Sequence, residues 1–488
     1  MKLRHLLGDD FPEVACLMAG VAGAVEISGV SSDSRKIKPG MLFVALSGAQ
    51  VDGEDFVGDA LRRGASAIVS AQSGARNVPV LDVCNRRRFL ALAAARLCEK
   101  QPDIVVAATG TAGKTSVVSF TRQIWSRSGH LAAQIGTTGV VSPSRSDHGS
   151  RTTPDPVTLH RILSDLEAEG VTHTAMEASS HGLDQCRLDG VRLTAGAFTN
   201  LGQDHLDYHS SREDYMAAKM RLFDTLLPKG APAVIYADDP ASNWATKIAA
   251  ESRLDVRTVG RSGRYLCLVG LEHRRGQQIM KLRFGDQVFE ATVPLVGEFQ
   301  IHNVLVAIAL SISTGVPPTT AIAAAEHLTG AAGRLERIGE TPEGAPVYVD
   351  YAHKPEALEA VLSAVRPSIA GRLILVFGCG GDRDKSKRRR MGEIAAKLSD
   401  IVIVTDDNPR SEDPAVIRSE ILEAAPGAIE IADRAEAIRV AINMLRKGDS
   451  LIVAGKGHEE GQVIGDMVVP YSDRDQVLAT LRGRQVQQ

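Results

Sequence analysis

The sequence has few features of a secreted, membrane-bound or disulfide-stabilised protein. Its six cysteines are scattered, at positions 16, 84, 98, 186, 267 and 379, and no two of them form a Cys-x-x-Cys pair. This spacing predicts neither a disulfide framework nor a zinc site, and it favours a reducing compartment. No apolar run reaches the length of a membrane span, and the N-terminus reaches Asp9 and Asp10 before any long apolar stretch. We therefore expect a cytoplasmic protein without a signal peptide or a membrane span.

The chain also lacks an excess of charge of either sign. Its 488 residues include 56 Lys and Arg against 59 Asp and Glu, a formal net charge of −3. Domains that bind nucleic acid are usually basic, so no nucleic acid partner is expected. One basic cluster is present, from Lys385 to Arg390, and we interpret it as a solvated loop and helix start.

The clearest motif is the stretch from Ile104 to Ser116. Its first residues are β-branched and predict a buried strand that breaks at Gly110, and after Lys114 apolar residues recur at helical spacing. Strand, glycine loop, Lys-Thr and helix together are typical of a nucleotide phosphate site. The loop N–H groups and the helix N-terminus would face the phosphates, and Thr115 would reach a magnesium ion. Ala108 stands where the full Walker pattern has its first glycine.

Length and hydrophobic pattern predict an α/β protein of three domains. We expect a small N-terminal α/β domain over residues 1–101, a central P-loop mononucleotide-binding domain over 102–334, and a Rossmann-like doubly wound domain over 335–488. Strands are expected at 40–45, 67–69, 78–82, 104–106, 171–176, 195–199, 233–236, 347–349, 373–377, 401–405 and 451–453, with antiparallel strands between 265 and 293 around a hairpin at 285–286. Helices are expected at 56–63, 86–99, 157–169, 355–365, 388–398 and 434–446.

Polar residues follow the ends of the predicted strands. In the central domain Glu177 follows one strand and the stretch 200–209 follows another. Open α/β sheets bind ligands at the carboxyl ends of their strands. In the C-terminal domain four further strand ends are polar, which predicts a second ligand-binding crevice; they are the stretches 350–353, 378–384, 406–410 and 455–459. The polar stretches 31–35 and 47–53 of the N-terminal domain are interpreted as loops.

Three central-domain residues allow more than one interpretation. Glu177 is a magnesium candidate, because hard cations prefer carboxylate oxygens, and the alternative is a surface acid at a strand end. His205 is either a metal ligand or an ordinary loop histidine, and the residues alone favour the loop. Lys219, on a predicted helix, is by itself interpreted as a solvated lysine.

The sequence has no Ser-His-Asp or Cys-His set that can be placed as a catalytic nucleophile. ATP-driven activation of a carboxylate as an acyl phosphate therefore fits better than covalent catalysis by a side chain. In such a reaction, electrostatic stabilisation of the transferring phosphoryl group contributes most to the rate.

Several motifs taken together resemble the Mur ligase family, in order and over essentially the whole chain. In the central domain they are Thr109-Gly-Thr-Ala-Gly-Lys-Thr115, Met176-Glu-Ala-Ser-Ser-His-Gly-Leu183, Thr199-Asn-Leu-Gly-Gln-Asp-His-Leu-Asp-Tyr-His209 and Ala218-Lys219. In the C-terminal domain they are Asp350-Tyr-Ala-His353, Gly378-Cys-Gly-Gly-Asp-Arg-Asp384 and Gly455-Lys-Gly-His-Glu459. Asp407-Asn-Pro-Arg410 resembles the signature of family members that add meso-diaminopimelate rather than lysine.

The resemblance implies an ATP-dependent amide ligase of peptidoglycan precursor synthesis. It would join meso-diaminopimelate to UDP-N-acetylmuramoyl-L-alanyl-D-glutamate, with Mg²⁺ as cofactor and ATP as co-substrate. ATP would phosphorylate the D-glutamyl γ-carboxylate, and an amine of diaminopimelate would attack the acyl phosphate. We expect the protein to act as a monomer.

The resemblance also implies roles for individual residues. The uridine nucleotide substrate would contact Ser32, Ser34, Ala49, Gln50, Val51, Thr152, Thr153, Ser179, Gln185 and Arg187. ATP would contact Gly110, Thr111, Ala112, Gly113, Lys114, Thr115, Ser116, Asn303, Arg334 and Asp350. Mg²⁺ would contact Thr115, Glu177, His205 and a carbamylated Lys219, and the catalytic residues would be Lys114, Glu177, His205 and Lys219. Diaminopimelate would contact Arg383, Asp407, Asn408, Pro409, Arg410, Gly455 and Glu459.

The last set of residues also suits its ligand chemically. Diaminopimelate carries two carboxylates and two ammonium groups, arginine binds carboxylates through bidentate forks, and Glu459 suits a distal ammonium. Lysine lacks the second carboxylate and would leave Arg410 unpaired, which is a basis for specificity. Two positions depart from the family pattern, because Ala112 and Arg151 stand where asparagine is usual.

Other functions stay open at this point. Within the same fold, the alternatives are a lysine-adding ligase, against which Asp407–Arg410 argues, and a folate polyglutamate synthetase, against which Ser31–Arg35 argues. From other classes, the alternatives are a P-loop switch or motor and a non-catalytic nucleotide-binding module. A motor needs no small-molecule site, so the polar strand ends argue against it.

Overall fold

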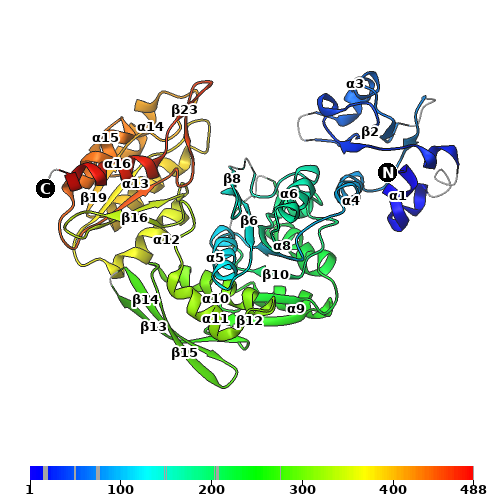
Figure 1. Ribbon diagram of the computed structural model, residues 1–488. Coiled ribbons are helices and arrows are strands. Elements are labelled where there is room, and N and C mark those ends of the chain that lie inside the picture. The colour runs from blue at the N-terminus through cyan, green and yellow to red at the C-terminus, as the bar shows by residue number, and fades with distance from the viewer. Residues whose placement is uncertain are drawn as a thin grey trace. The chain divides into compact units, whose positions relative to one another are not determined.

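The protein folds into two compact α/β units. The computed structural model describes residues 1–14, 20–48, 51–72, 77–147, 149, 151–202, 204, 208–274 and 276–486. The first unit contains Met1–Lys114, Thr121–Thr258 and Ala309–Val316, and the second contains Thr115–Phe120, Val259–Ile308 and Pro317–Gln488. No helix in these ranges is long and apolar enough to cross a membrane. Figure 1 labels many of the helices and strands of each unit.

The first unit begins with a parallel sheet of four strands in the order β1-β2-β3-β4. The strands are Gly29–Ser31, Met41–Val44, Ala67–Val69 and Val80–Leu81, and the helices are α1 (Leu3–Leu7), α3 (Val57–Arg62) and α4 (Arg86–Cys98). Leu3, Leu42 and Phe89 are fully buried in its core. Ser31 is the last residue of β1, so the prediction of a loop from residue 31 is wrong for that residue.

A second sheet of the first unit carries the predicted nucleotide motif. Its strands follow the order β12-β11-β10-β5-β9-β6-β7-β8, and the pairs of β5 with β9 and β10, of β10 with β11 and of β6 with β9 are parallel. The strands are β5 (Ile104–Thr109), β6 (Ala132–Gly136), β7 (Gly139–Val141), β8 (Ser146–Asp147), β9 (His173–Glu177), β10 (Ala195–Phe198), β11 (Pro232–Tyr236) and β12 (Asp255–Gly260). The helices are α5 (Lys114–Arg127, of which Lys114 and Thr121–Arg127 belong to this unit), α6 (Pro156–Ala168), α7 (Ser180–Asp184), α8 (Arg212–Arg221) and α9 (Ser242–Glu251). Strands β6, β7, β8 and β12 are not among the predicted ones.

The second unit contains a six-stranded sheet in the order β16-β17-β21-β18-β19-β20, antiparallel only at β16. The strands are Glu336–Glu340, Pro346–Asp350, Ser450–Ala454, Leu373–Phe377, Ile401–Val404 and Ile429–Glu430, in that order. The helices are α12 (Pro355–Val365), α13 (Ser386–Leu398), α14 (Pro414–Leu422), α15 (Arg434–Met444) and α16 (Asp473–Val486).

Alternate side chains of these strands enter two different cores. On β18, Leu375 packs in a core with α12, α13 and α14, whereas Val376 packs in a core with α15 and α16. Helices therefore cover both faces of the sheet, which confirms the predicted doubly wound arrangement.

The second unit also contains antiparallel strands and two further helices. Strands β13 (Leu266–Arg274), β14 (Gln277–Phe284) and β15 (Gln287–Val293) pair antiparallel, which confirms the predicted hairpin at 285–286. Strands β22 (Gly461–Ile464) and β23 (Met467–Pro470) form a second hairpin. Helix α10 runs from Glu298 to Ser313 and α11 from Pro318 to Ala324.

The basic cluster at the start of α13 is only partly solvated. Arg388 is fully buried, and its guanidinium donates to Glu412 and Glu420 at 2.9 Å each. The same guanidinium lowers the pKa of Glu412 to about 2. The interpretation of the whole cluster as solvated is therefore wrong for Arg388, which joins α13 to α14.

A second buried arginine gives a test of the stability of this unit. Arg434 donates to both carboxylate oxygens of Asp473 (2.7 and 2.8 Å), and both side chains are buried. We expect Asp473→Ala to destabilise the unit by about 3–5 kcal/mol, because it leaves a buried guanidinium without its counter-charge. Urea unfolding followed by far-ultraviolet circular dichroism measures this. Asp475→Ala, which removes an exposed carboxylate from the same helical turn, is the control and should have little effect.

Candidate functional site

The loop between β5 and α5 has a shape that requires glycine. Gly110 has φ +147°, and a Cβ there would lie 1.9 Å from the Thr199 hydroxyl oxygen. Gly113 has φ +86° and directly precedes the first residue of α5. The Lys114 ammonium donates to the carbonyls of Gly110 (2.7 Å) and Thr111 (3.0 Å). The loop is thus a compact strand-to-helix turn, as the motif predicts.

The two residues after β10, Thr199 and Asn200, hold this loop in place. The Asn200 side chain accepts from the Ala112 N–H (2.9 Å) and donates to the Ala112 carbonyl (3.1 Å). The Thr199 hydroxyl also donates to the Ala112 carbonyl (2.6 Å). The backbone of Ala112 is therefore fixed on both sides although its side chain is only a methyl group.

Glu177 is the last residue of β9 and is 1% exposed, so the surface-acid interpretation is wrong. Its two carboxylate oxygens accept from the Thr137 N–H (2.8 Å) and the Thr137 hydroxyl (3.2 Å). A Cβ at Gly136 would lie 2.2 Å from the Glu177 Oε1 atom. The end of β6 thus fixes the carboxylate, and the absence of a side chain at Gly136 makes room for it.

Five residues predicted to contact the uridine substrate form one hydrogen-bonded group next to Glu177. The Thr152 hydroxyl lies 3.0 Å from that of Thr137, and the Thr153 hydroxyl donates to the Glu177 carbonyl (2.8 Å). The remaining contacts are Thr153 with Ser179 (3.1 Å), Arg187 with the Thr153 carbonyl (2.7 Å) and Arg187 with Gln185 (2.8 Å). The structure therefore brings Thr152, Thr153, Ser179, Gln185 and Arg187 together.

Three of the remaining predicted uridine contacts lie in the described part of the N-terminal segment. Ser32 directly follows β1 and is exposed, Ser34 is buried in the short 3-10 helix Ser34–Lys36, and Val51 is exposed. Ala49 and Gln50 lie outside the described residues, as does the predicted metal ligand His205.

Lys219 on α8 is 1% exposed, so its interpretation as a solvated lysine is wrong. Its Nζ donates to the Gly110 carbonyl (2.9 Å) and lies 4.0 Å from the centre of the Tyr215 ring. Burial, and then the charge of Lys114, lower the pKa of Lys219 well below its usual value. A lowered pKa favours the neutral amine, which is the form of a lysine that reacts with electrophiles.

In the second unit, hydrogen bonds link the three residues predicted to contact ATP. The side chain of Gln300 links Asn303 to Arg334, and the N–H of Leu335, the residue after Arg334, links Arg334 to Asp350. Gln300 donates to the Arg334 carbonyl (3.0 Å) and accepts from the Asn303 amide (3.4 Å). The Asp350 carboxylate accepts from the N–H of Leu335 (2.6 Å) and of Ala352 (2.7 Å). Burial raises the pKa of Asp350 to about 6.

Two glycines let the loop that carries Arg334 touch the loop Gly455–Glu459. Gly333 has φ +64°, and a Cβ there would lie 2.3 Å from the His458 amide nitrogen. Gly457 has φ +56°, and a Cβ there would lie 2.7 Å from that of Tyr351. The guanidinium of Arg334 lies 4.7 Å from the Tyr351 ring centre. Backbone thus packs directly on backbone between these two loops.

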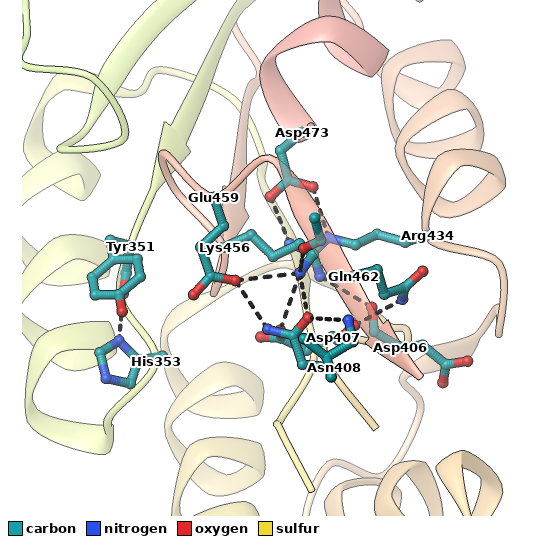
Figure 2. Close-up of polar contacts among 12 residues, drawn as sticks. Tyr351, His353, Asp406, Asp407, Asn408, Arg434, Lys456, Glu459, Gln462 and Asp473 are labelled. Carbon is teal, nitrogen blue, oxygen red and sulfur yellow. Dashed lines mark hydrogen bonds and ion pairs between the residues drawn. The ribbon is translucent and has the colours of Figure 1, made fainter. Parts of the chain in front are cut away.

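Figure 2 shows the polar cluster formed by the loops after β19 and β21. Asn408 donates to Glu459 (2.9 Å), and both Asn408 and Asp407 are buried. At Gly455, with φ +114°, a Cβ would lie 2.8 Å from the Asp407 carboxylate. The structure therefore brings Asp407, Asn408, Gly455 and Glu459 together, as predicted.

The other predicted amino-acid contacts lie close by in the chain. Pro409 is buried, and Arg410 has φ +52° and donates from its guanidinium to the Gly381 carbonyl (2.8 Å). Arg383 is exposed and donates to the Asp382 carbonyl (3.3 Å). Within the described chain, no hydrogen bond or ion pair joins Arg383 to the other predicted contacts.

Comparison with known proteins decides the family. Three family models match successive segments: "Mur ligase family, catalytic domain" over residues 26–97, "Mur ligase middle domain" over 108–311 and "Mur ligase, glutamate ligase domain" over 333–457. A protein of Agrobacterium fabrum (strain C58 / ATCC 33970), named UDP-N-acetylmuramoyl-L-alanyl-D-glutamate–2,6-diaminopimelate ligase, is 61% identical over 489 residues and covers 100% of both chains. The chain belongs to the Mur ligase family. The predicted three-domain α/β fold of this Mur ligase is thereby confirmed, whereas the exact domain boundaries remain predictions.

Further relatives agree with the assignment of this chain to the Mur ligase family. A protein of the same name from Rhizobium meliloti (strain 1021) is 58% identical and covers 99% of this chain and 100% of its own. A solved structure of a ligase of that name has 32% identity and a TM-score of 0.71, over 94% of this chain and 95% of that one. A folylpolyglutamate synthase of Mycobacterium tuberculosis, at 17% identity, 76% coverage of this chain, 92% of its own and a TM-score of 0.61, shares the fold.

Two side chains of this Mur ligase belong to the candidate sites although the sequence did not single them out. Asn200 holds the phosphate loop, and Lys456 lies at the centre of the cluster in Figure 2. Both stand inside motifs that carry the resemblance, so their position in a motif is the signal that could have found them. Their burial and partners depend on long-range contacts, which the sequence does not show.

The buried amine of Lys219 makes a testable difference to stability. Between its lowered pKa in the fold and its ordinary value of 10.5, only the unfolded chain binds the proton, so stability rises with pH in that window. In bicarbonate-free buffer, Lys219→Met should therefore raise the midpoint of thermal unfolding at pH 7, and the gain should shrink toward pH 10.5. Lys229→Met, at an exposed lysine, should show neither effect. A gain that did not change with pH would contradict this account.

Proposed function

We propose that this Mur ligase joins meso-2,6-diaminopimelate to UDP-N-acetylmuramoyl-L-alanyl-D-glutamate, using ATP, in peptidoglycan precursor synthesis. The names of its full-length relatives at 61% and 58% identity support the reaction. The structural observation that carries the proposal is the cluster of Asp407, Asn408 and Glu459 near Arg410, since it offers both signs of charge to one ligand. The enzyme works in the cytoplasm, as a monomer.

The reaction has two steps. A γ-carboxylate oxygen of the D-glutamyl residue attacks the γ-phosphorus of ATP, and ADP leaves. An amine nitrogen of diaminopimelate then attacks the acyl carbon, loses a proton, and phosphate leaves as the amide bond forms. Both steps need charge stabilisation at the phosphoryl group more than they need a side-chain nucleophile.

The phosphate loop binds the nucleotide in this proposal. The N–H groups of residues 110–116 face the phosphates at the start of α5, and Lys114 leaves the loop carbonyls to contact the terminal phosphate. Asn303, Arg334 and Asp350 of the second unit contact the rest of ATP. Thr152, Thr153, Ser179, Gln185 and Arg187, with Ser32, Ser34, Ala49, Gln50 and Val51, bind the uridine nucleotide substrate.

Thr115, Glu177, His205 and carbamylated Lys219 would hold Mg²⁺ in this proposal, and the ion would supply positive charge to neutralise the phosphates. The Glu177 carboxylate, held by Thr137 at the end of β6, suits a hard cation. Lys219 becomes a carbamate when its neutral Nζ attacks the carbon of CO₂ and loses a proton, which turns a buried amine into a carboxylate-like ligand. Carbon-13 NMR with labelled bicarbonate should show a carbamate resonance in the wild type that is absent in Lys219→Met.

An amino-acid panel tests the function. Purified protein, ATP, Mg²⁺ and the uridine nucleotide acceptor are incubated with single amino acids, and phosphate release and product mass are measured. Phosphate and a mass increase of one diaminopimelate residue should depend on the acceptor and on meso-diaminopimelate. Equal use of lysine would contradict the specificity, and ATP turnover without either substrate would favour a switch or motor.

Arg410 provides a prediction for substrate affinity. Lysine cannot reproduce the bidentate geometry with which arginine binds a carboxylate. We expect Arg410→Lys to raise KM for diaminopimelate by about 10- to 100-fold, the range for one charge-assisted hydrogen bond, while KM for ATP stays unchanged. Steady-state kinetics measure both constants. Arg446→Lys, at an exposed arginine, is the matched control, and an unchanged KM in Arg410→Lys would remove this residue from the site.

A further inference from the structure

Lys456 is a buried lysine inside the motif Gly455–Glu459. Its side chain is 0% exposed. Its ammonium lies 2.8 Å from the Asn408 amide oxygen, 2.8 Å from the Gly461 carbonyl, 3.3 Å from Glu459 and 3.6 Å from Asp407 (Figure 2). An ammonium has three N–H donors, and these partners are enough to engage all of them.

Lys456 fixes the orientation of the Asn408 amide. The Asn408 oxygen accepts from Lys456 and from the Val463 N–H (2.9 Å), so the opposite amide orientation would place an NH₂ group against two donors. The Asn408 nitrogen consequently faces Glu459 and donates to its Oε2 atom (2.9 Å). Lys456 therefore holds Glu459 both directly and through Asn408.

This arrangement leaves one oxygen of Glu459 for a ligand. Both contacts from Asn408 and Lys456 go to Oε2, and the Glu459 side chain is 33% exposed. Within the described residues, no hydrogen bond or ion pair is made to Oε1. A ligand ammonium can therefore bind Oε1 while Lys456 and Asn408 hold Oε2.

Lys456 also sets the total charge of the site. The carboxylates of Asp407 and Glu459 both form ion pairs with Lys456, the guanidinium of Arg410 is a second cation beside them at the Asn408 carbonyl (3.4 Å), and the neighbouring Arg434 is already paired with Asp473. The distal end of diaminopimelate is an ammonium with a carboxylate and is neutral, whereas the distal end of lysine is a lone ammonium. A neutral site suits the first, and a site with one extra negative charge suits the second.

We propose that Lys456 is a specificity-determining positioning residue, whose charge makes the cluster neutral and thereby favours the zwitterionic end of a diamino diacid over lysine. The proposal rests on the proposed function, because it assigns this cluster to the incoming amino acid. Lys456 acts through Asn408 and Glu459 and is not a catalytic residue. Its charge and its contacts with these two residues together determine the preference.

Lys456→Met tests the proposal, because methionine has a similar length and no charge. We expect kcat/KM for meso-diaminopimelate to fall about 10- to 100-fold, mainly through KM, the range for one charge-assisted interaction. For lysine, measured as substrate and as competitive inhibitor, kcat/KM should fall less or should rise. The ratio of kcat/KM for meso-diaminopimelate to kcat/KM for lysine should therefore fall. KM for ATP and for the uridine nucleotide should not change. Lys447→Met, at an exposed lysine, should keep the wild-type ratio.

Two further variants separate charge from structure. Lys456→Met combined with Glu459→Gln removes one charge of each sign, so the ratio should return toward that of the wild type even though both affinities stay low. Asn408→Asp adds a negative charge beside an unchanged Lys456, at the expense of the hydrogen bond to Glu459, and should shift the ratio toward lysine. This variant keeps the proposal testable if Lys456→Met does not fold.

The outcomes distinguish this proposal from the proposed function. Product formation from diaminopimelate by the wild type tests the function alone, and its absence would overturn both. If the wild type forms product but Lys456→Met and Asn408→Asp reduce use of both amino acids by the same factor, Lys456 is a structural residue and the proposal is wrong.

Discussion

In each unit, the chemistry of a buried lysine depends on which protein groups replace the water around its ammonium group. Burying a charge costs several kcal/mol unless partners replace its hydration. Among the described residues, the Lys219 nitrogen meets the Gly110 carbonyl and the Tyr215 ring, and burial lowers its pKa although the charge of Asp204 opposes this. Lys456 contacts two carboxylates and an amide oxygen, and these contacts order its neighbours. The same side chain thus has a lowered pKa in one place and forms ion pairs with two carboxylates in the other.

Much of the fold could be predicted because its main strands are short apolar runs that stop at polar residues. Strands β5, β10 and β18 lie within about one to three residues of their expected bounds, as do helices α12 and α13. Strands β6, β7 and β8 were missed because they have only two to five residues each, and β6 and β8 consist mostly of small or polar residues. Such segments become strands through pairing with β9 and with one another, and that pairing is a long-range property.

The motifs of the candidate sites could be predicted from the sequence, but the burial and the contacts of their side chains could not. Glycine loops, strand-end carboxylates and the run Asp407–Arg410 are visible in the sequence. Whether Lys219 or Arg388 meets water depends on elements distant in the chain, so the solvated interpretation of each was wrong. Asn200 was missed for the same reason, because its contact with the loop joins residues 88 positions apart.

The contact between Gly333 and the His458 peptide has a consequence for communication between ligands. It leaves no side chain, and no gap that a side chain could fill, between the loop of Arg334 and the loop of Glu459. A displacement of either backbone by a bound molecule must be accommodated by the other. Thermodynamic linkage makes any such effect reciprocal: if the nucleotide alters affinity for the amino acid, the amino acid alters affinity for the nucleotide by the same factor. The absence of side chains at Gly333 and Gly457 can therefore make binding of the nucleotide and binding of the amino acid interdependent.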